Sequence, residues 1–117
     1  MTGIGGIFFR SRDPDGRAAW YRERLGVELG EDGTWQQEAG PTVFAPFPAE
    51  SDYFPPDQPF MLNLRVSDLD GLAEELEASG IPVERRSEWD SAGFGRFARV
   101  HDPEGLPIEL WEPPASP

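Results

Sequence analysis

Apolar and polar residues form two successive strand-then-helix patterns along the chain. In the second half, a strand with one buried face is predicted by the alternation of Leu62, Leu64 and Val66. The spacing then becomes helical, and an amphipathic helix is predicted by Leu69, Leu72, Ala73 and Leu76. Ser67 or Asp68 suits the helix N-cap, Gly80 ends the helix, and Pro82 prevents its continuation.

The first half repeats this order. Residues 7–11 are rich in β-prone side chains, and Asp13 followed by Pro14 predicts an N-cap and a first helical position. One helical face is formed by Ala18, Tyr21 and Leu25, and Gly26 suits the C′ position. Residues 13–18 therefore match residues 68–73, with a register shift of about 55 residues. An internal duplication explains why strand, cap, helix and helix end agree in order and spacing between the two halves. The alternative is that two capped helices are similar by chance.

Short β-prone segments follow each helix, at residues 26–31, 34–38 and 42–47 and again at 81–88, 94–100 and 106–112. The pattern predicts an α+β fold of two tandem βαβββ modules. Module 1 covers about residues 3–48, a Pro- and Asp-rich connector covers about 49–59, and module 2 covers about 60–113. Neither half would bury much core alone, so 117 residues predict a single domain.

Composition excludes several classes of function. The net charge of −12 disfavours nucleic-acid binding, because phosphate backbones would be repelled. The absence of cysteine excludes disulfides, thiolate catalysis and Cys-ligated metal sites. We find neither a signal-peptide pattern nor an apolar run of membrane-spanning length, so a cytoplasmic protein without membrane contact is expected. Nucleophile-elbow, P-loop, dinucleotide-binding and zinc-protease motifs are also missing.

The paired patterns resemble the vicinal oxygen chelate superfamily, which includes glyoxalase I, extradiol dioxygenases, fosfomycin-resistance enzymes and bleomycin-resistance proteins. The similarity rests on the two helix segments, residues 12–26 and 65–81, and on the closing segment "DPEGLPIELWEP", residues 102–113. It implies that each module adds strands to one curved mixed sheet around a cavity, where the enzymes bind a divalent metal. It also implies a homodimer, since proteins of this superfamily commonly assemble through their sheets.

The resemblance places four metal-ligand positions at Gly6, Phe44, Met61 and Glu109. Glu109 is the one residue of the four that suits a hard divalent cation, which needs three or four oxygen or nitrogen ligands. No metal or other cofactor is therefore predicted. Two alternatives stay open: a different register would turn Gln36 or Glu38 toward the cavity, or a second chain would supply ligands. His101, the single histidine, precedes a turn and is expected in solvent.

Strand alternation predicts which side chains line the cavity. The aromatic and polar candidates for ligand binding are Phe8, Arg10, Trp35, Phe44, Met61, Asn63, Arg65 and Trp111. Glu109 is the candidate catalytic residue. A buried carboxylate needs a partner, so Glu109 either pairs with an arginine or, unpaired, acts as a general base with a raised pKa. The alternative for the aromatic residues is that they form ordinary core.

These features suggest a metal-free protein that binds an apolar or aromatic small molecule, as the drug-sequestering resistance proteins do. The alternative is an enzyme of the same superfamily, a lyase, isomerase or dioxygenase that uses metal in an altered site or Glu109 as a base. A protein-interaction domain is a third hypothesis, suggested by Tyr53 and Phe54 in the connector.

Overall fold

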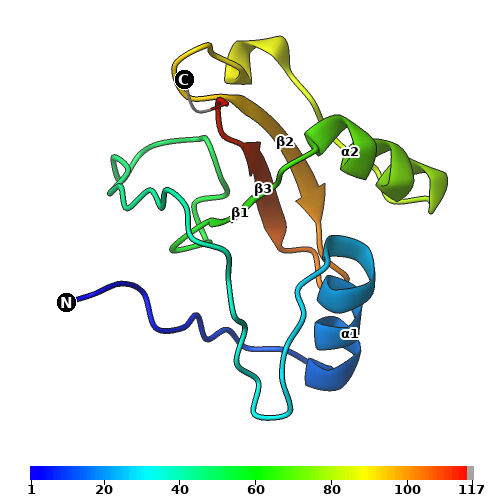
Figure 1. Ribbon diagram of the computed structural model, residues 1–117. Coiled ribbons are helices and arrows are strands. Elements are labelled where there is room, and N and C mark those ends of the chain that lie inside the picture. The colour runs from blue at the N-terminus through cyan, green and yellow to red at the C-terminus, as the bar shows by residue number, and fades with distance from the viewer. Residues whose placement is uncertain (116–117) are drawn as a thin grey trace.

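The computed structural model describes residues 1–115 and contains a three-stranded sheet with two helices on one side of it (Figure 1). The elements in chain order are α1 (Pro14–Leu25), β1 (Leu62–Arg65), α2 (Leu69–Ala78), a short 3-10 helix η1 (Ser87–Trp89), β2 (Arg96–His101) and β3 (Pro107–Glu112). The strand order is β1-β3-β2. β1 runs parallel to β3 and β2 runs antiparallel to it, so the closing strand lies at the centre of the sheet.

The two helices begin in the same way, as the sequence predicts. The carboxylate of Asp13 accepts a hydrogen bond from the backbone N–H of Gly16, and Asp68 does the same for Gly71. A Cβ at either glycine would collide with the capping carboxylate, which explains why both motifs have glycine there. α1 ends at Gly26, whose φ of 70° is the left-handed conformation that glycine adopts most readily.

The core lies between the helices and one face of the sheet. The strands contribute Ala98, Val100, Ile108 and Leu110, and α2 contributes Leu69 and Leu76. Tyr21 brings α1 into the same cluster. Alternation places these strand residues on one face, because successive side chains of a strand point to opposite sides. The predicted apolar faces of both helices are confirmed at Tyr21, Leu69, Ala73 and Leu76.

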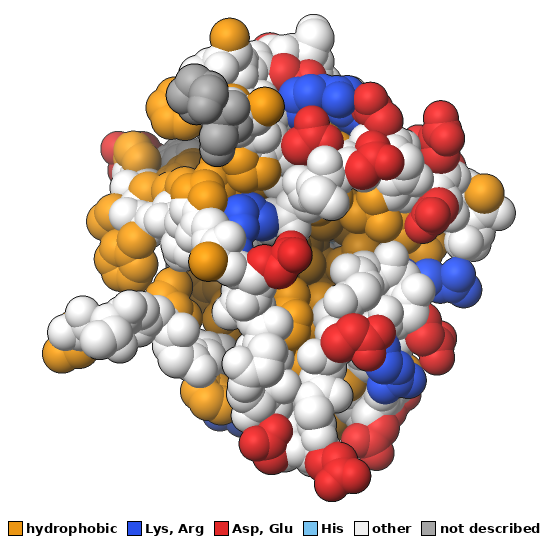
Figure 2. Space-filling model, in the orientation of Figure 1, with side chains coloured by type: hydrophobic (Ala, Val, Ile, Leu, Met, Phe, Trp, Pro, Cys, Tyr) orange, Lys and Arg blue, Asp and Glu red, His pale blue; other side chains and the backbone are white. Residues whose placement is uncertain are grey.

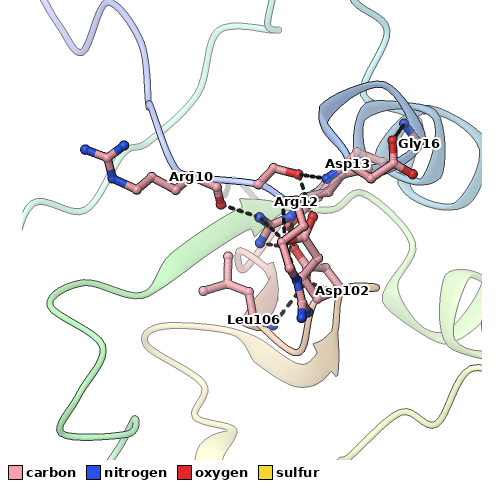
Figure 3. Close-up of polar contacts among 10 residues, drawn as sticks. Arg10, Arg12, Asp13, Gly16, Asp102 and Leu106 are labelled. Carbon is pink, nitrogen blue, oxygen red and sulfur yellow. Dashed lines mark hydrogen bonds and ion pairs between the residues drawn. The ribbon is translucent and has the colours of Figure 1, made fainter.

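α1 is tied to the β2–β3 turn by a buried ion pair (Figure 3). Arg17 donates from Nε to Asp102 Oδ2 at 2.7 Å, and the hydroxyl of Tyr21 donates to the same oxygen at 2.8 Å. The other oxygen of Asp102 accepts from the backbone N–H groups of Glu104 and Leu106. This network joins the predicted first module to the second across 85 residues of sequence.

The first half differs from the prediction, because residues 1–10 and 36–48 form no strand. Between α1 and β1, the structure has an isolated bridge that pairs Leu29 with Trp35. Prolines explain part of this difference, since Pro41, Pro46 and Pro48 have no N–H to donate to a ladder. Glycines at positions 3, 5 and 6 weaken the predicted first strand, as they favour many backbone conformations. In the second half, the predicted strand segment 81–88 forms no strand. It contains the isolated bridge from Glu84 to Arg99, and η1 begins at its end.

Many apolar side chains of the first half therefore face solvent. Phe8 is 93% exposed and Phe44 is 84% exposed. Figure 2 shows hydrophobic side chains gathered on the side where the N-terminal segment lies, while acidic side chains cluster over the helices. In the described residues, no helix has the length and apolar character needed to cross a membrane.

Candidate functional site

The face of the sheet opposite the helices carries polar and aromatic side chains instead of a core. Glu109 at the middle of β3 lies beside Asn63 of β1 and opposite Arg99 of β2. Two positions further along, Trp111 lies opposite Phe97. Since residues at i and i+2 of a strand share a face, these five side chains form one continuous surface, which we call the Glu109 face.

Glu109 is 7% exposed, and its carboxylate is satisfied by neutral donors. The amide of Asn63 donates to Oε1 at 2.7 Å, and the hydroxyl of Tyr53 donates to Oε2. Burial, followed by the hydrogen bond to Glu109, raises the pKa of Tyr53 above its usual value. Tyr53 therefore stays protonated and acts as a donor across the physiological pH range.

Arg99 lies next to this carboxylate without forming an ion pair with it. Its guanidinium stacks 5.1 Å from the centre of the Tyr53 ring and 5.2 Å from that of Trp89. Nη2 donates to the backbone oxygen of Tyr53 at 2.7 Å and lies 4.0 Å from the sulfur of Met61. The buried Nε has no hydrogen-bond partner among residues 1–115.

Phe97 and Trp111 form a flat aromatic platform at the other end of the face. Their rings are nearly parallel, with centres 6.3 Å apart and an angle of 9° between planes. The indole Nε1 of Trp111 donates to the backbone oxygen of Phe94 at 2.7 Å, which fixes the ring orientation. The platform therefore presents aromatic area in a set geometry beside a buried carboxylate.

The structure brings Met61, Asn63, Arg65 and Trp111 to the Glu109 face, where Arg65 lies opposite Trp111, but it places the other predicted ligand-binding residues elsewhere. The guanidinium of Arg65 donates to the backbone oxygens of Glu38 and Pro41, so it holds the first-half chain against β1. Arg10 extends away from the polar cluster at α1 (Figure 3). Phe8 and Phe44 are exposed, and Trp35 pairs with Leu29.

Four residues on this face were missed in the sequence: Tyr53, Trp89 and Arg99, which contact one another, and Phe97, which stacks with Trp111. Alternation along residues 94–100 could have indicated two of them. Ala98 and Val100 are small and apolar and belong to the core face, so Phe97 and Arg99 lie on the opposite face of the strand. Tyr53 lies in an irregular segment, so no periodicity indicates its position.

A broad concavity lies between the sheet and the first half of the chain. Its volume is about 3100 Å³, and its walls include Phe8, Trp35, Phe44, Asn63, Arg65, Glu109 and Trp111. Small-molecule pockets usually measure roughly 300–1,000 Å³. The concavity is therefore an open space, and of the Glu109 face it includes Asn63, Phe97, Glu109 and Trp111 but not Arg99.

The donor set does not fit a divalent cation. Among the residues that the structure describes, no group of three or more His, Asp or Glu side chains could hold a metal. The neighbours of Glu109 are an amide, a phenol and a guanidinium, and the last of these repels cations.

Comparison with known proteins identifies the fold. The crystal structure of TnmS3, an antibiotic binding protein from Streptomyces sp. CB03234, matches with a TM-score of 0.61 and 24% identity over 97% of each chain. No curated protein matches the chain significantly. The sequence model of the glyoxalase-like domain matches residues 6–111, which is most of the chain. The chain thus belongs to the glyoxalase-like domain family of the vicinal oxygen chelate superfamily.

Proposed function

We propose that this protein binds an apolar or aromatic small molecule on the Glu109 face and does so without a divalent metal. The observation that carries the proposal is a buried carboxylate, held by two neutral donors, next to a stacked aromatic platform. Such a combination of apolar area and a few fixed polar groups is typical of small-molecule sites.

Each part of the face has a role in binding. In the Phe97–Trp111 platform, Trp111 is 7% exposed, so the half-buried ring of Phe97 offers the surface on which a planar ligand can stack. Asn63 and Arg99 provide hydrogen-bond donors, while Glu109 provides the acceptor. The similarity to TnmS3, an antibiotic binding protein, supports a small-molecule ligand of this kind.

The two-module arrangement and a homodimer belong to the same proposal. The exposed aromatic side chains of the first half, Phe8 and Phe44 among them, would be covered if a second copy packed against this side. In the two-module arrangement, residues 3–48 close the cavity from the side opposite the sheet of module 2.

Calorimetric titration with 2-methoxynaphthalene, an aromatic probe without charge or donor, tests the binding function. We expect saturable binding to the wild type and about tenfold weaker binding to Phe97→Ala, because stacked aromatic contact contributes on the order of 1 kcal/mol beyond area. Leu29→Ala, which removes apolar area away from the platform, is the matched control. Equal loss in both variants, or no binding at all, would contradict the proposal.

Metal analysis of protein purified without chelator tests the metal-free part. We expect no stoichiometric divalent metal. A stoichiometric metal that disappears in Glu109→Gln would overturn this part of the proposal.

One observation favours an enzyme as the second candidate. Glu109 is buried, and in the described residues no cationic group lies within ion-pair distance of it. Its carboxylate is therefore not held in an ion pair, which suits a general base. A lyase, isomerase or dioxygenase that depends on Glu109 predicts that Glu109→Gln abolishes turnover while thermal unfolding stays near that of the wild type. Unchanged turnover would remove the carboxylate from the mechanism.

A further inference from the structure

Tyr53 occupies the Glu109 face although it comes from the connector and from no strand. Its hydroxyl reaches Glu109, its ring lies beneath the guanidinium of Arg99, and its edge meets the ring of Trp89 at 6.2 Å and 71°. The groups that meet its hydroxyl, and its guanidinium and indole neighbours, belong to module 2, while Phe47 of module 1 packs against the ring, with centres 5.8 Å apart. The connector thus places one phenol into a site built by other parts of the chain.

The connector is attached to the sheet mainly through this residue. Among residues 49–59, the hydrogen bonds to the sheet are made by the Tyr53 hydroxyl and the Tyr53 backbone oxygen. The other hydrogen bonds of this segment are local, such as Ser51 N–H to Pro48 O and Gln58 N–H to Pro55 O. Tyr53 can therefore leave Glu109 without breaking a strand ladder.

Departure of Tyr53 would leave a set of groups that matches a phenol. Glu109 would lack a donor, the guanidinium of Arg99 would lack one ring face, and Trp89 would lack an edge contact. A buried carboxylate that loses a donor is costly, so the site favours any replacement that brings a hydroxyl. Glu109 also lines the concavity, so a ligand that enters it meets the carboxylate.

We propose that the Glu109 face recognises ligands with a phenolic hydroxyl, and that Tyr53 fills this position until such a ligand displaces it. The inference rests on the proposed function and names its ligand class. Specificity comes from the carboxylate acceptor, because a methyl ether of the same ring cannot supply the missing donor. The apparent affinity of the wild type is lowered by the fraction of molecules in which Tyr53 still occupies the site.

Two probes that differ in the hydroxyl test the proposal: 2-naphthol and 2-methoxynaphthalene, titrated by calorimetry at neutral pH. In Tyr53→Ala, we expect 2-naphthol to bind at least about tenfold more tightly than in the wild type, since the competing phenol is gone. In the same variant, we expect 2-naphthol to bind about 10- to 100-fold more tightly than 2-methoxynaphthalene, as a hydrogen bond to a charged acceptor would give.

Further variants separate the contributions. Tyr53→Ala/Glu109→Met should lose the preference for 2-naphthol, because the acceptor is gone. Tyr53→Phe keeps the ring but not the hydroxyl, and should give a 2-naphthol affinity between those of the wild type and Tyr53→Ala. Phe54→Ala, which changes the neighbouring connector residue without touching Glu109, should leave both affinities as in the wild type.

Equal affinities of the two probes in Tyr53→Ala would overturn phenol recognition. An unchanged 2-naphthol affinity in both Tyr53→Ala and Tyr53→Phe would overturn displacement of Tyr53. In either case, binding of 2-methoxynaphthalene that depends on Phe97 would still support the proposed function. If the proposed small-molecule binding itself were wrong, neither probe would bind to any variant.

Discussion

At the scale of single residues, the two buried carboxylates of the structure have opposite surroundings. Asp102 is paired with Arg17, and two of its four hydrogen bonds hold α1 to the β2–β3 turn, while the other two stabilise the turn itself. Glu109 accepts from neutral groups and lies on the face opposite α1 and α2. The first carboxylate therefore has a structural role, while the second is suited to recognition or chemistry.

The ion pair of Arg17 and Asp102 gives a prediction on stability. The side chains are 7% and 0% exposed, so removal of one partner leaves a buried charge unpaired. We expect Arg17→Ala to lower the free energy of unfolding by about 3–5 kcal/mol in urea titrations. Arg22→Ala, on the exposed side of α1, should change it by less than about 0.5 kcal/mol. A loss in Arg17→Ala as small as in this control would contradict the structural role.

Both tyrosines of the chain donate to buried carboxylates, and this predicts an unusual titration. Burial, and then the hydrogen bonds to Asp102 and Glu109, raise the pKa values of Tyr21 and Tyr53 above the ordinary 10.0. Stability from a raised pKa is present below the unfolded value and is lost as pH rises past it. We therefore expect phenolate absorbance to appear only together with unfolding, above about pH 10. A separate phenolate transition in the folded protein near pH 10 would contradict the buried hydrogen bonds.

At the scale of elements, the turn before β2 depends on a glycine. Gly95 has a φ of 113°, and a Cβ there would collide with the backbone oxygen of Glu112 at the end of β3. We expect Gly95→Ala to lower the free energy of unfolding by on the order of 2–3 kcal/mol. We also expect it to weaken binding of an aromatic ligand, because the turn positions the Phe94 backbone oxygen that accepts the hydrogen bond of Trp111. Gly93→Ala, with open space around its Cβ position, is the control in the same turn.

The contact between the start of α1 and the β2–β3 turn predicts acid sensitivity. Hydrogen bonds from the Ser11 hydroxyl and the Arg12 N–H, together with the charge of Arg17, lower the pKa of Glu104 from 4.5 to about 2. Its stabilising contribution is therefore complete above about pH 4.5 and is lost as the pH falls toward about 2. We expect the Tm of the wild type to fall more steeply over this window than that of Glu104→Gln. Parallel Tm curves for the two proteins would rule out this contribution.

At the scale of the whole molecule, the exposed apolar side chains of the first half predict self-association. A contiguous apolar surface of this kind is usually covered by a partner, and a second copy is the partner that the family resemblance implies. We expect sedimentation velocity to show a dimer in the wild type and a shift toward monomer in Phe44→Asp. Thr42→Asp adds the same charge at a neighbouring exposed position and is the matched control. A wild type that stays monomeric at high concentration would contradict the proposal.

The sequence predicted the second half of the fold well, because its signals are local. Capping by Asp68, helical spacing through Leu76 and the apolar, strand-like run in residues 107–112 depend on neighbours a few residues apart, and the structure confirms each of them. The first half was predicted less well. Its segments resemble strands in composition, but whether they pair depends on distant partners, and their prolines remove the donors that pairing needs.

By itself, the sequence determined the helices, the closing strand and the presence of one glutamate among the apolar residues of that strand, since local periodicity and capping decide these. Only the tertiary structure decided what surrounds Glu109. The register of β1 and β2 against β3 brings Asn63 and Arg99 beside it, and an irregular connector brings Tyr53 across 56 residues of sequence. Such contacts arise from packing between remote segments, and no local pattern encodes them.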